Sequence, residues 1–483
     1  MTTLLFQTKT TERMGIVVQN NTIKEIMVDR PDNNLSAGTI LIGKVRNIEE
    51  GLKAAFIDLG LEKPGFLPEN EYPLKDKAHF NSDLSEGART IVQVTKEAYQ
   101  DKGPKLTANI TITGKGLIYL PFGDYVAFSK KIENEAREKY QPIFRENLKG
   151  TEGVIIRTHA EKMTVDDLLK ELDYLRMKWQ DIVESSKATK KIKVIHQPKK
   201  SPEQLINRYL STDIEHVYID DPQSANVLRE MHPNLRDNII FETEIEKLLP
   251  ISIDGLIDQI LTRRITVDKG VRLFFDQTEA MHIIDIDSSQ YHSNKDKKSM
   301  VRSVNEIAAY AIADEIRKRN LAGIIIIDFI TMRHPKDRKH IIDCLKDAFI
   351  SDPTRTEIYG FTKLGLLEMS RKRESNSMLE LFGEASRNHE MKKNNTSYGY
   401  SLERYLRQLQ VRNVEAIAIK IHPEVAKTFK DNVIDVLKSS IYVDLYWEVT
   451  DQVDGFEIIR EGSTNLVNDW LSENDRENID KVL

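Results

Sequence analysis

The chain has 483 residues, enough for about three domains of ordinary size. Apolar residues make up 40% and charged residues 30%, a balance that indicates a folded globular protein and excludes a fibrous or wholly disordered one. The formal net charge of −6 excludes a basic surface over the whole molecule, so a surface for nucleic acid would have to be local.

The sequence also predicts the compartment. No apolar run approaches the roughly 18 residues that a membrane span requires, and residues 1–7 lack the basic and apolar regions of a secretory signal. Cys344 is the only cysteine, which excludes an internal disulfide and a cysteine-rich zinc site. We therefore expect a cytoplasmic protein without a membrane span.

The first part of the chain predicts β-structure. Residues 13–18 and 23–28 are apolar runs on either side of the turn signal Asn20-Asn21, and they predict a hairpin. Between residues 36 and 112, short β-rich stretches alternate with Gly and Pro, which favours a small barrel over βαβ units. The strands expected there include residues 40–48, 52–59 and 90–96.

The middle of the chain predicts a long helix followed by a basic linker. Over residues 165–184, apolar side chains recur at helical spacing; they are Leu168, Leu169, Leu172, Leu175 and Ile182. After the helix, lysines cluster beside Pro198 and Pro202, which favours a solvated loop over a nucleic-acid contact. A strand at 216–219 and a helix at 223–231 are expected next.

Residues 273–329 predict an α/β segment. Strands are expected at 273–276 and 283–287, a helix at 304–319 and a further strand at 322–329. The last strand is continuously apolar, a pattern typical of a sheet that is covered on both faces. Farther along, residues 386–399 have the composition of a linker.

Two of these strands carry acidic residues where they end. Asp285 and Asp287 share one strand face because strand side chains alternate with period two, and Asp328 follows the apolar run of the later strand. If the two strands are neighbours, three carboxylates converge. Such a group favours a hard divalent cation such as Mg²⁺ and suits phosphoryl transfer. The alternative is that each aspartate caps the loop or helix that follows its strand.

The expected barrel contains aromatic and basic residues that suit RNA. Phe56 and Phe66 lie in Gly-containing stretches, and Lys102 and Lys105 follow the strand at 90–96. OB-type barrels bind single strands by stacking bases on aromatic rings, at about 1 to 3 kcal/mol per base, within a positive groove. The alternative is that each phenylalanine is a core residue.

Arg157-Thr158 follows an expected strand at 154–156. A guanidinium beside a hydroxyl at the end of a strand suits a terminal phosphate, which presents several acceptor oxygens. A surface salt bridge of Arg157 is the alternative.

These motifs occur together in one known family. The chain resembles the bacterial ribonuclease E/G family, most closely its ribonuclease G branch, over most of its length. The segments that carry the resemblance are Gly43-Lys44-Val45, Ala54-Ala55-Phe56-Ile57-Asp58-Leu59-Gly60, Gly65-Phe66-Leu67-Pro68, Asp276-Gln277-Thr278-Glu279-Ala280, Ile284-Asp285-Ile286-Asp287, Ala313-Asp314-Glu315-Ile316, Ile327-Asp328-Phe329-Ile330 and Gly365-Leu366-Leu367-Glu368-Met369-Ser370-Arg371.

The resemblance implies an α/β multidomain fold. Its parts are an RNase H-like subdomain split between residues 1–35 and 191–261, an inserted S1-type OB-fold RNA-binding barrel at 36–112, a 5′-sensor region at 113–190, a DNase I-like catalytic subdomain at 262–385, the linker at 386–399, a small C-terminal α/β domain at 400–470 and a polar tail at 471–483.

The resemblance also assigns roles to residues. It implies that Asp285 and Asp328 are catalytic and bind Mg²⁺, that Arg157 and Thr158 bind the 5′-monophosphate, and that Phe56, Phe66 and Lys102 contact RNA. Asp287 stands where the family usually has Asn, and its extra charge beside the metal makes it a further candidate ligand.

Four other residues are candidates with plain alternatives. Arg371 and Arg373 could hold phosphates of the RNA, with an ordinary helix surface as the alternative. His282 and His292 lie near the acids and are conceivable proton donors, although a structural role is favoured for both.

This chain departs from the pattern of the family at the position of the zinc link. A Cys-Pro-x-Cys motif should follow Arg373, but residues 374–399 contain no cysteine. This argues against zinc and against the subunit link that it builds, so a monomer and a homodimer through the C-terminal domain both stay open.

The leading hypothesis is a Mg²⁺-dependent endoribonuclease that cuts single-stranded RNA, such as rRNA precursors or mRNA, and favours a 5′-monophosphorylated end. The alternative is a non-catalytic RNA-binding or ribosome-associated protein whose function depends on the barrel. A deoxyribonuclease is a third hypothesis, which rests on fold analogy alone.

Overall fold

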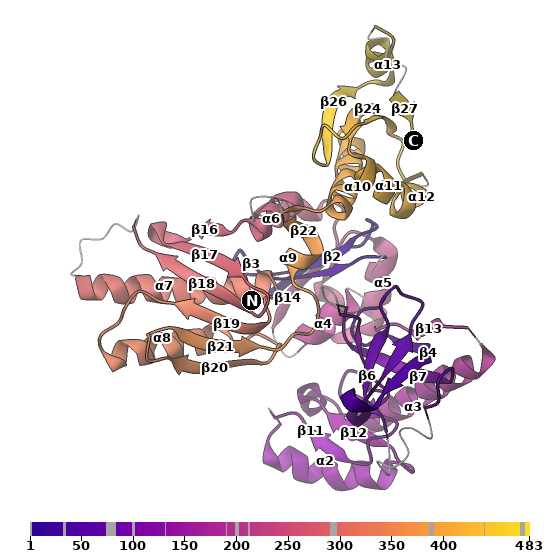
Figure 1. Cartoon of the computed structure of the whole chain (residues 1–483), viewed down its shortest axis with the longest axis vertical. Helices are drawn as coiled ribbons and strands as arrows, with labels where there is room; N and C mark the ends of the chain where they lie inside the picture. Colours follow the sequence, from indigo (N-terminus) through magenta and orange to yellow (C-terminus); the bar gives the residue numbers. More distant parts are fainter. Residues whose placement is uncertain are drawn as a thin grey trace. The chain divides into compact units, whose positions relative to one another are not determined.

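The computed structural model of the chain (Figure 1) describes residues 2–31, 35–73, 84–98, 102–130, 132–189, 191–198, 202–210, 213–289, 297–385, 391–438, 440–473 and 479–483. They form two compact units. One comprises Met1–Asp32, Ile214–Arg373 and Ser377–Leu483, and the other comprises Asn33–Asp213 with Glu374–Asn376. Among the described residues, no helix is both long and apolar enough to span a lipid bilayer.

The first unit begins with a mixed five-stranded sheet. Its strand order is β15 (Ile239–Phe241), β14 (Ile214–Ile219), β1 (Thr2–Gln7), β2 (Arg13–Gln19) and β3 (Thr22–Asp29). β1, β2 and β3 are antiparallel, whereas β14 is parallel to both β1 and β15. Asn20 and Asn21 both adopt positive φ, at 50° and 57°, as a two-residue type I′ turn requires. The predicted hairpin is confirmed.

A second sheet of the same unit has six strands. Their order is β16 (Arg264–Thr266), β17 (Arg272–Gln277), β18 (Met281–Asp287), β19 (Gly323–Asp328), β21 (Leu367–Arg371) and β20 (Thr356–Phe361). Only β18 and β19 are parallel to each other. Helices α7 (Lys297–Lys318) and α8 (Pro335–Ala348) contribute to the core on one face of this sheet. The strands and helices expected at 273–329 are therefore present.

The other face of this sheet is open, and the expectation that β19 is covered on both faces is wrong. Ile325 and Ile327 are fully buried, but Ile324 is 51% exposed and Asp328 is exposed. Four consecutive isoleucines conceal the alternation of inward and outward side chains because β-branched residues suit a strand on either face.

The C-terminal part of the first unit is a small α/β domain. Helix α10 (Asn395–Val411) leads into a sheet with the order β26 (Phe456–Gly462), β24 (Ala416–Ile421), β25 (Asp444–Val449) and β27 (Ile479–Lys481). The helices α11 (Pro423–Asn432), α12 (Ile434–Lys438) and α13 (Thr464–Glu473) complete it. The expected polar tail at 471–483 thus includes the end of α13 and the strand β27, which pairs with β25.

The expected linker at 386–399 is also partly regular structure. Strand β23 (Met391–Lys393) pairs with β22 (Gly383–Ala385), which follows α9 (Met378–Phe382), and α10 begins at Asn395. The Asn394 side chain caps α10 by accepting a hydrogen bond from Ser397 N–H at 2.9 Å. Residues that suit loops therefore begin a helix here.

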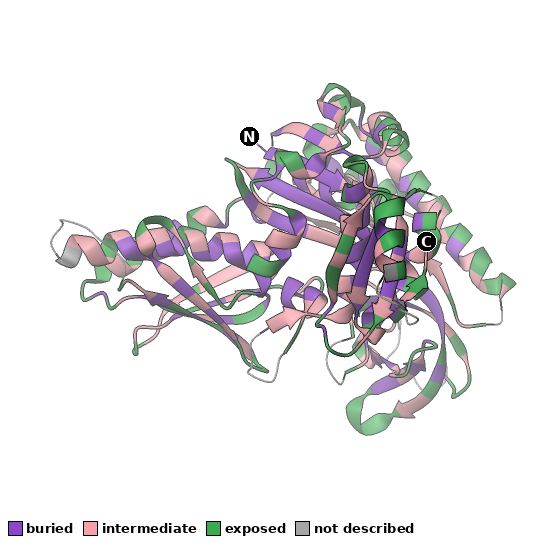
Figure 2. Ribbon diagram, turned by 90° about the horizontal axis from the view of Figure 1, so that it is seen from above, coloured by how far each residue is buried: buried purple, intermediate pink, exposed green. Residues whose placement is uncertain are grey.

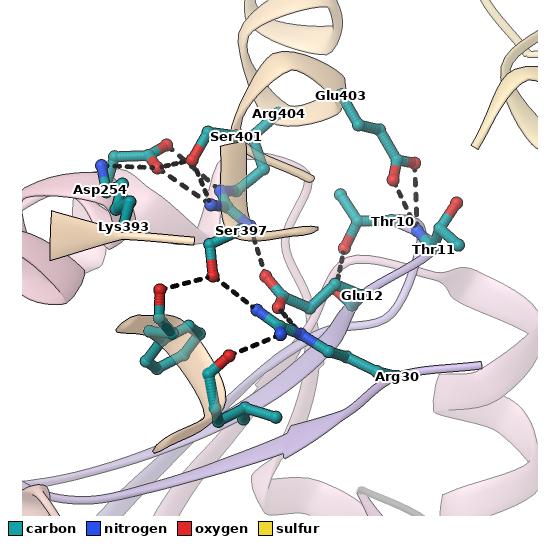
Figure 3. Close-up of polar contacts among 12 residues, drawn as sticks. Thr10, Thr11, Glu12, Arg30, Asp254, Lys393, Ser397, Ser401, Glu403 and Arg404 are labelled. Carbon is teal, nitrogen blue, oxygen red and sulfur yellow. Dashed lines mark hydrogen bonds and ion pairs between the residues drawn. The ribbon is translucent and has the colours of Figure 1, made fainter. Parts of the chain in front are cut away.

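A buried ionic network attaches α10 to the first sheet (Figure 3). Glu12 accepts from Arg30 Nε and from Arg404 Nη1, each at 2.6 Å, and Arg404 also reaches Asp254 at 2.9 Å. Arg30 in turn donates to Ser397 Oγ at 2.9 Å. Glu12 and Arg404 are almost fully buried, so each charge depends on its partner. Asp254 lies on α6 (Ile253–Leu261).

The second unit contains a closed barrel of five strands. They are β4 (Ile40–Glu49), β5 (Ala54–Asp58), β6 (Gly65–Pro68), β8 (Lys105–Thr107) and β7 (Arg89–Lys96), and pairing of β4 with β7 closes the ring. This confirms the expected small barrel. Strand β13 (Lys193–His196) also pairs with β4. The expected boundary at residue 191 placed these residues in the same subdomain as residues 1–35, but they belong to the barrel sheet.

The rest of the second unit packs helices on a four-stranded sheet. The strand order is β11 (Val126–Phe128), β12 (Gly153–Ile156), β10 (Leu117–Leu120) and β9 (Ile112–Thr113). Helices α2 (Asn134–Asn147) and α3 (Val165–Ala188) share its core, and α4 (Glu203–Tyr209) lies farther along the chain. Leu168, Leu172, Leu175 and Ile182 are buried on α3, and buried and exposed residues alternate along the helices (Figure 2). The predicted helix at 165–184 is confirmed and extends to residue 188.

Candidate active site and RNA-binding surfaces

Asp285 and Asp328 lie opposite each other on the neighbouring parallel strands β18 and β19. Directly opposed residues of adjacent strands point to the same face of a sheet. That face is the open one, because Ile284 and Ile286 of β18 and Ile327 of β19 point into the core with α7 and α8. Both aspartates are exposed. The condition on which their convergence depends, that the two strands are neighbours, is therefore met.

The electrostatics of this pair suit a divalent cation. Partial burial and the nearby carboxylate of Asp285 raise the pKa of Asp328. Asp285 accepts one hydrogen bond, from Ile286 N–H at 2.9 Å, and within the described ranges neither carboxylate has a salt-bridge partner. Two carboxylates side by side are relieved by a proton or by a hard cation. The donor set thus fits Mg²⁺.

Asp287 lies on the same strand face, two residues beyond Asp285, but it is engaged locally. Its carboxylate accepts from Ser289 N–H at 2.7 Å and from the Ser289 hydroxyl at 2.9 Å, and Arg272 lies 3.6 Å away. The hydrogen bonds from Ser289 lower the pKa of Asp287. Asp287 therefore caps the end of its strand, and its role as a metal ligand stays a prediction.

The structure places His282 on the opposite face from the acid pair. It is 5% exposed, and burial together with the charge of Arg373 lowers its pKa to about 4. A neutral, buried imidazole on the core side does not face the open surface, which agrees with the structural role favoured for it. His292 lies outside the described residues.

Arg371 is also on the core side. Its guanidinium donates to Asp352 at 2.8 and 3.2 Å and to Asn320 Oδ1 at 2.9 Å, and its side chain is 2% exposed. It holds the end of β21 and is not at a surface where RNA could reach it. The sequence indicated this position, because Leu367, Met369 and Arg371 are every second residue of a strand and therefore share one face. Arg373 is half-buried, and its charge acts on His282.

Phe56 and Phe66 form an aromatic pair on the barrel. They are register partners on β5 and β6, with ring centroids 5.7 Å apart at an interplanar angle of 61°. Both are half-buried, so part of each ring faces solvent. Lys105 is in register with Phe66, and Lys102 is exposed. These features agree with a surface on which bases can stack.

Arg157 and Thr158 lie where β12 ends and a 3-10 turn (Thr158–Lys162) begins. The Arg157 guanidinium donates to the carbonyls of Gly114 at 2.6 Å and Lys115 at 3.3 Å. Burial lowers the pKa of Arg157, and the charge of Glu171 opposes this. The Thr158 hydroxyl lies 3.1 Å from that of Ser129. Backbone contacts therefore hold the guanidinium in place.

Sequence reasoning missed three basic neighbours of Arg157. Burial and the charges of Lys162, Arg157 and Lys115 lower the pKa of His159. Three cationic side chains therefore lie near His159, and the carboxylate of Glu171 also lies near Arg157. His159 and Lys162 follow Arg157 within five residues in the sequence, a local basic cluster that could have been noticed.

Comparisons with known proteins identify the family of the chain. A sequence profile described as "Ribonuclease E/G family" matches residues 111–374, which include Arg157, Thr158, Asp285 and Asp328. Ribonuclease G of Haemophilus influenzae is 30% identical over 394 residues, which cover 78% of this chain and 80% of that protein.

Two further relatives extend the comparison. Ribonuclease G of Escherichia coli is 28% identical over 393 residues, covering 78% of this chain and 80% of that protein. Ribonuclease E of Synechocystis sp. is 27% identical over 386 residues, covering 77% of this chain and 57% of that protein. The chain therefore belongs to the ribonuclease E/G family.

Proposed function

We propose that this ribonuclease is a Mg²⁺-dependent endonuclease that cuts single-stranded RNA, such as rRNA precursors or mRNA, and favours a 5′-monophosphorylated end. The observation that carries the proposal is the register of β18 and β19, which pairs Asp285 with Asp328 on the open face of a sheet. The raised pKa of Asp328 supports it, because that shift arises in part from the Asp285 carboxylate.

Asp285 and Asp328 would hold the ion. When bound, Mg²⁺ supplies Lewis-acid stabilisation of charge on the phosphoryl oxygens and lowers the pKa of a water. The chain contributes two carboxylates on rigid neighbouring strands, and the open face leaves room for an RNA backbone. In-line hydrolysis of the phosphodiester leaves 5′-phosphate and 3′-hydroxyl ends.

We assign the parts of the fold as follows. The strand order and directions of the first sheet support an RNase H-like subdomain, and the sheet with the acid pair corresponds to the DNase I-like catalytic subdomain. The closed barrel is consistent with an S1-type OB fold, with Phe56, Phe66 and Lys102 as its RNA contacts.

Arg157 and Thr158 form the proposed site for the 5′-monophosphate. The basic residues around them support this assignment, because a terminal phosphate carries more negative charge than a hydroxyl or an internal phosphodiester. The zinc link of the family does not fit this chain, since residues 374–399 contain no cysteine. No subunit contact through such a link is proposed.

The test is cleavage of a 5′-monophosphorylated, single-stranded oligoribonucleotide by the full chain, with Mg²⁺ and with a chelator. We expect cleavage only with Mg²⁺, faster than that of the 5′-hydroxyl form. Cleavage in the chelator would contradict the role of the acid pair. RNA binding without cleavage would identify a non-catalytic RNA-binding protein, and equal cleavage of a 2′-deoxy strand would identify a general nuclease.

A further inference from the structure

Helices α7 and α8 bring together a set of side chains that the nuclease function does not use. Glu306 lies on α7, and His340 and Cys344 lie one turn apart on α8, so both α8 residues point to the same side of that helix. Cys344 is 5% exposed and belongs to the core beneath the sheet, whereas His340 and Glu306 are partly exposed. The group therefore lies on the helix layer, on the opposite side of the sheet from the acid pair.

Two of the separations between the three potential ligand atoms match a tetrahedral metal site. His340 Nε2 lies 3.5 Å from Glu306 Oε2 and 3.6 Å from Cys344 Sγ, and all three atoms lie within 4.8 Å of one another. With usual zinc bond lengths, a tetrahedron places nitrogen about 3.4 Å from oxygen and about 3.6 Å from sulfur. His340 therefore already has this spacing to both of the other ligands.

The kind of donor indicates the kind of ion. A thiolate, an imidazole and one carboxylate suit Zn²⁺ and similar transition metals, whereas Mg²⁺ and Ca²⁺ prefer oxygen ligands alone. Glu306 and His340 reach solvent, so water can supply a fourth ligand. Tyr310, one turn beyond Glu306 on α7, lies against the thiol and donates to Asp347 at 3.2 Å, and such surrounding polar groups orient the ligands of metal sites.

We propose that Glu306, His340 and Cys344 bind one divalent transition-metal ion of the zinc type and that this ion links α7 to α8. The two helices follow β18 and β19, the strands that carry Asp285 and Asp328. The ion would therefore stabilise the helix layer under the acid pair. An ion pair between His340 and Glu306 without metal is the competing interpretation, and such a partly exposed pair contributes little to stability.

The test is titration of the metal-free full chain with Zn²⁺ and with Co²⁺ in excess Mg²⁺, which occupies all-oxygen sites. We expect one equivalent to bind and Co²⁺ to produce a thiolate-to-metal charge-transfer band. Because Cys344 is the only cysteine, that band identifies its ligand. Zinc should also slow alkylation of the thiol and raise the thermal midpoint.

Variants separate the proposal from its alternatives. Cys344→Ser, His340→Gln and Glu306→Gln should each weaken zinc binding by more than the roughly 10- to 100-fold that loss of a ligand's hydrogen-bond partner costs. His334→Gln, at an exposed residue before α8, should leave zinc binding unchanged. If Cys344→Ser does not fold, the partly exposed His340 and Glu306 provide the same readout. Zinc binding that survives these changes, or Co²⁺ binding without a charge-transfer band, would overturn the site. Cleavage of RNA is not the readout, so the result is independent of the proposed nuclease function.

Discussion

The direction in which a strand residue points decides the role of each candidate in the catalytic sheet. Asp285 and Asp328 face the open side, whereas His282, three residues before Asp285, and Arg371 face the core. The acid pair was predictable because strand periodicity and the apolar run before Asp328 are visible in the sequence. The interior place of Arg371 was predictable in principle from its alternation with Leu367 and Met369, but its partner Asp352 is distant in the sequence and could not be foreseen.

His282 should make stability depend on pH. Its folded pKa of about 4 lies below the value of about 6.5 for an unfolded histidine. The contribution of His282 to the free energy of unfolding is therefore present above about pH 6.5. It falls as the pH drops toward 4, by about 2 kcal/mol at pH 5. In His282→Gln, the loss between pH 7 and pH 5 should be smaller by about that amount, as measured by urea unfolding with circular dichroism. His334→Gln, at an exposed position, is the control, and an unchanged pH dependence in His282→Gln would contradict the prediction.

Arg157→Gln should remove the preference for a 5′-monophosphate. A charge-assisted hydrogen bond to phosphate contributes about 1.5 to 3 kcal/mol, so the ratio of cleavage rates for 5′-phosphate and 5′-hydroxyl substrates should fall by about tenfold or more. Cleavage of the 5′-hydroxyl substrate should stay the same. Arg145→Gln, at an exposed arginine of α2, is the matched control. A preserved ratio in Arg157→Gln would place the 5′-end elsewhere.

At the scale of elements, strands and helices with a clear period were predictable, and elements that depend on distant partners were not. The hairpin at Asn20-Asn21 and the helix α3 follow from local signals. β13 reads as part of a basic linker, yet it pairs with β4, more than 140 residues earlier in the chain. The start of α10 reads as a loop because Ser397 and its neighbours are polar, and their buried partners, such as Arg30, lie far away in the sequence.

The ionic network that attaches α10 should be essential to stability. Arg404→Met would leave Glu12 buried without one of its two partners, and such changes destabilise a protein by about 3 to 5 kcal/mol. Burial opposes ionisation of Asp254, but the charges and hydrogen bonds of its partners, above all Arg404, together outweigh burial and lower the pKa of Asp254 to about 2. The contribution of Asp254 to stability is therefore present above about pH 4 and disappears as the pH falls toward 2.

Urea unfolding of Arg404→Met and of Arg412→Met tests this role. Arg412, on the same domain, pairs with Glu461 at 2.9 Å but is 56% exposed, so its loss should change stability by less than about 1 kcal/mol. Equal effects of the two substitutions would show that the buried network does not hold the domain in place.

At the scale of the molecule, the proposed tasks are divided between the two units. The second unit carries the aromatic pair of the barrel and the basic surroundings of Arg157, and the first unit carries the acid pair. The overall charge of −6 conceals the local basic region. This proposed division of tasks comes from the resemblance to the family, whereas composition alone predicted only several domains and no global basic surface.

The most direct test compares cleavage and binding in Asp285→Asn, Asp328→Asn and Asp343→Asn. Asp343 is an exposed residue of α8 and serves as the control for the loss of a carboxylate. A metal ion at a reacting phosphate contributes several kcal/mol, so either substitution in the pair should reduce single-turnover cleavage by about 1000-fold or more while the affinity for RNA stays within about twofold of the unmodified chain, and Asp343→Asn should cleave normally. Cleavage at the normal rate by Asp285→Asn or Asp328→Asn would contradict the account.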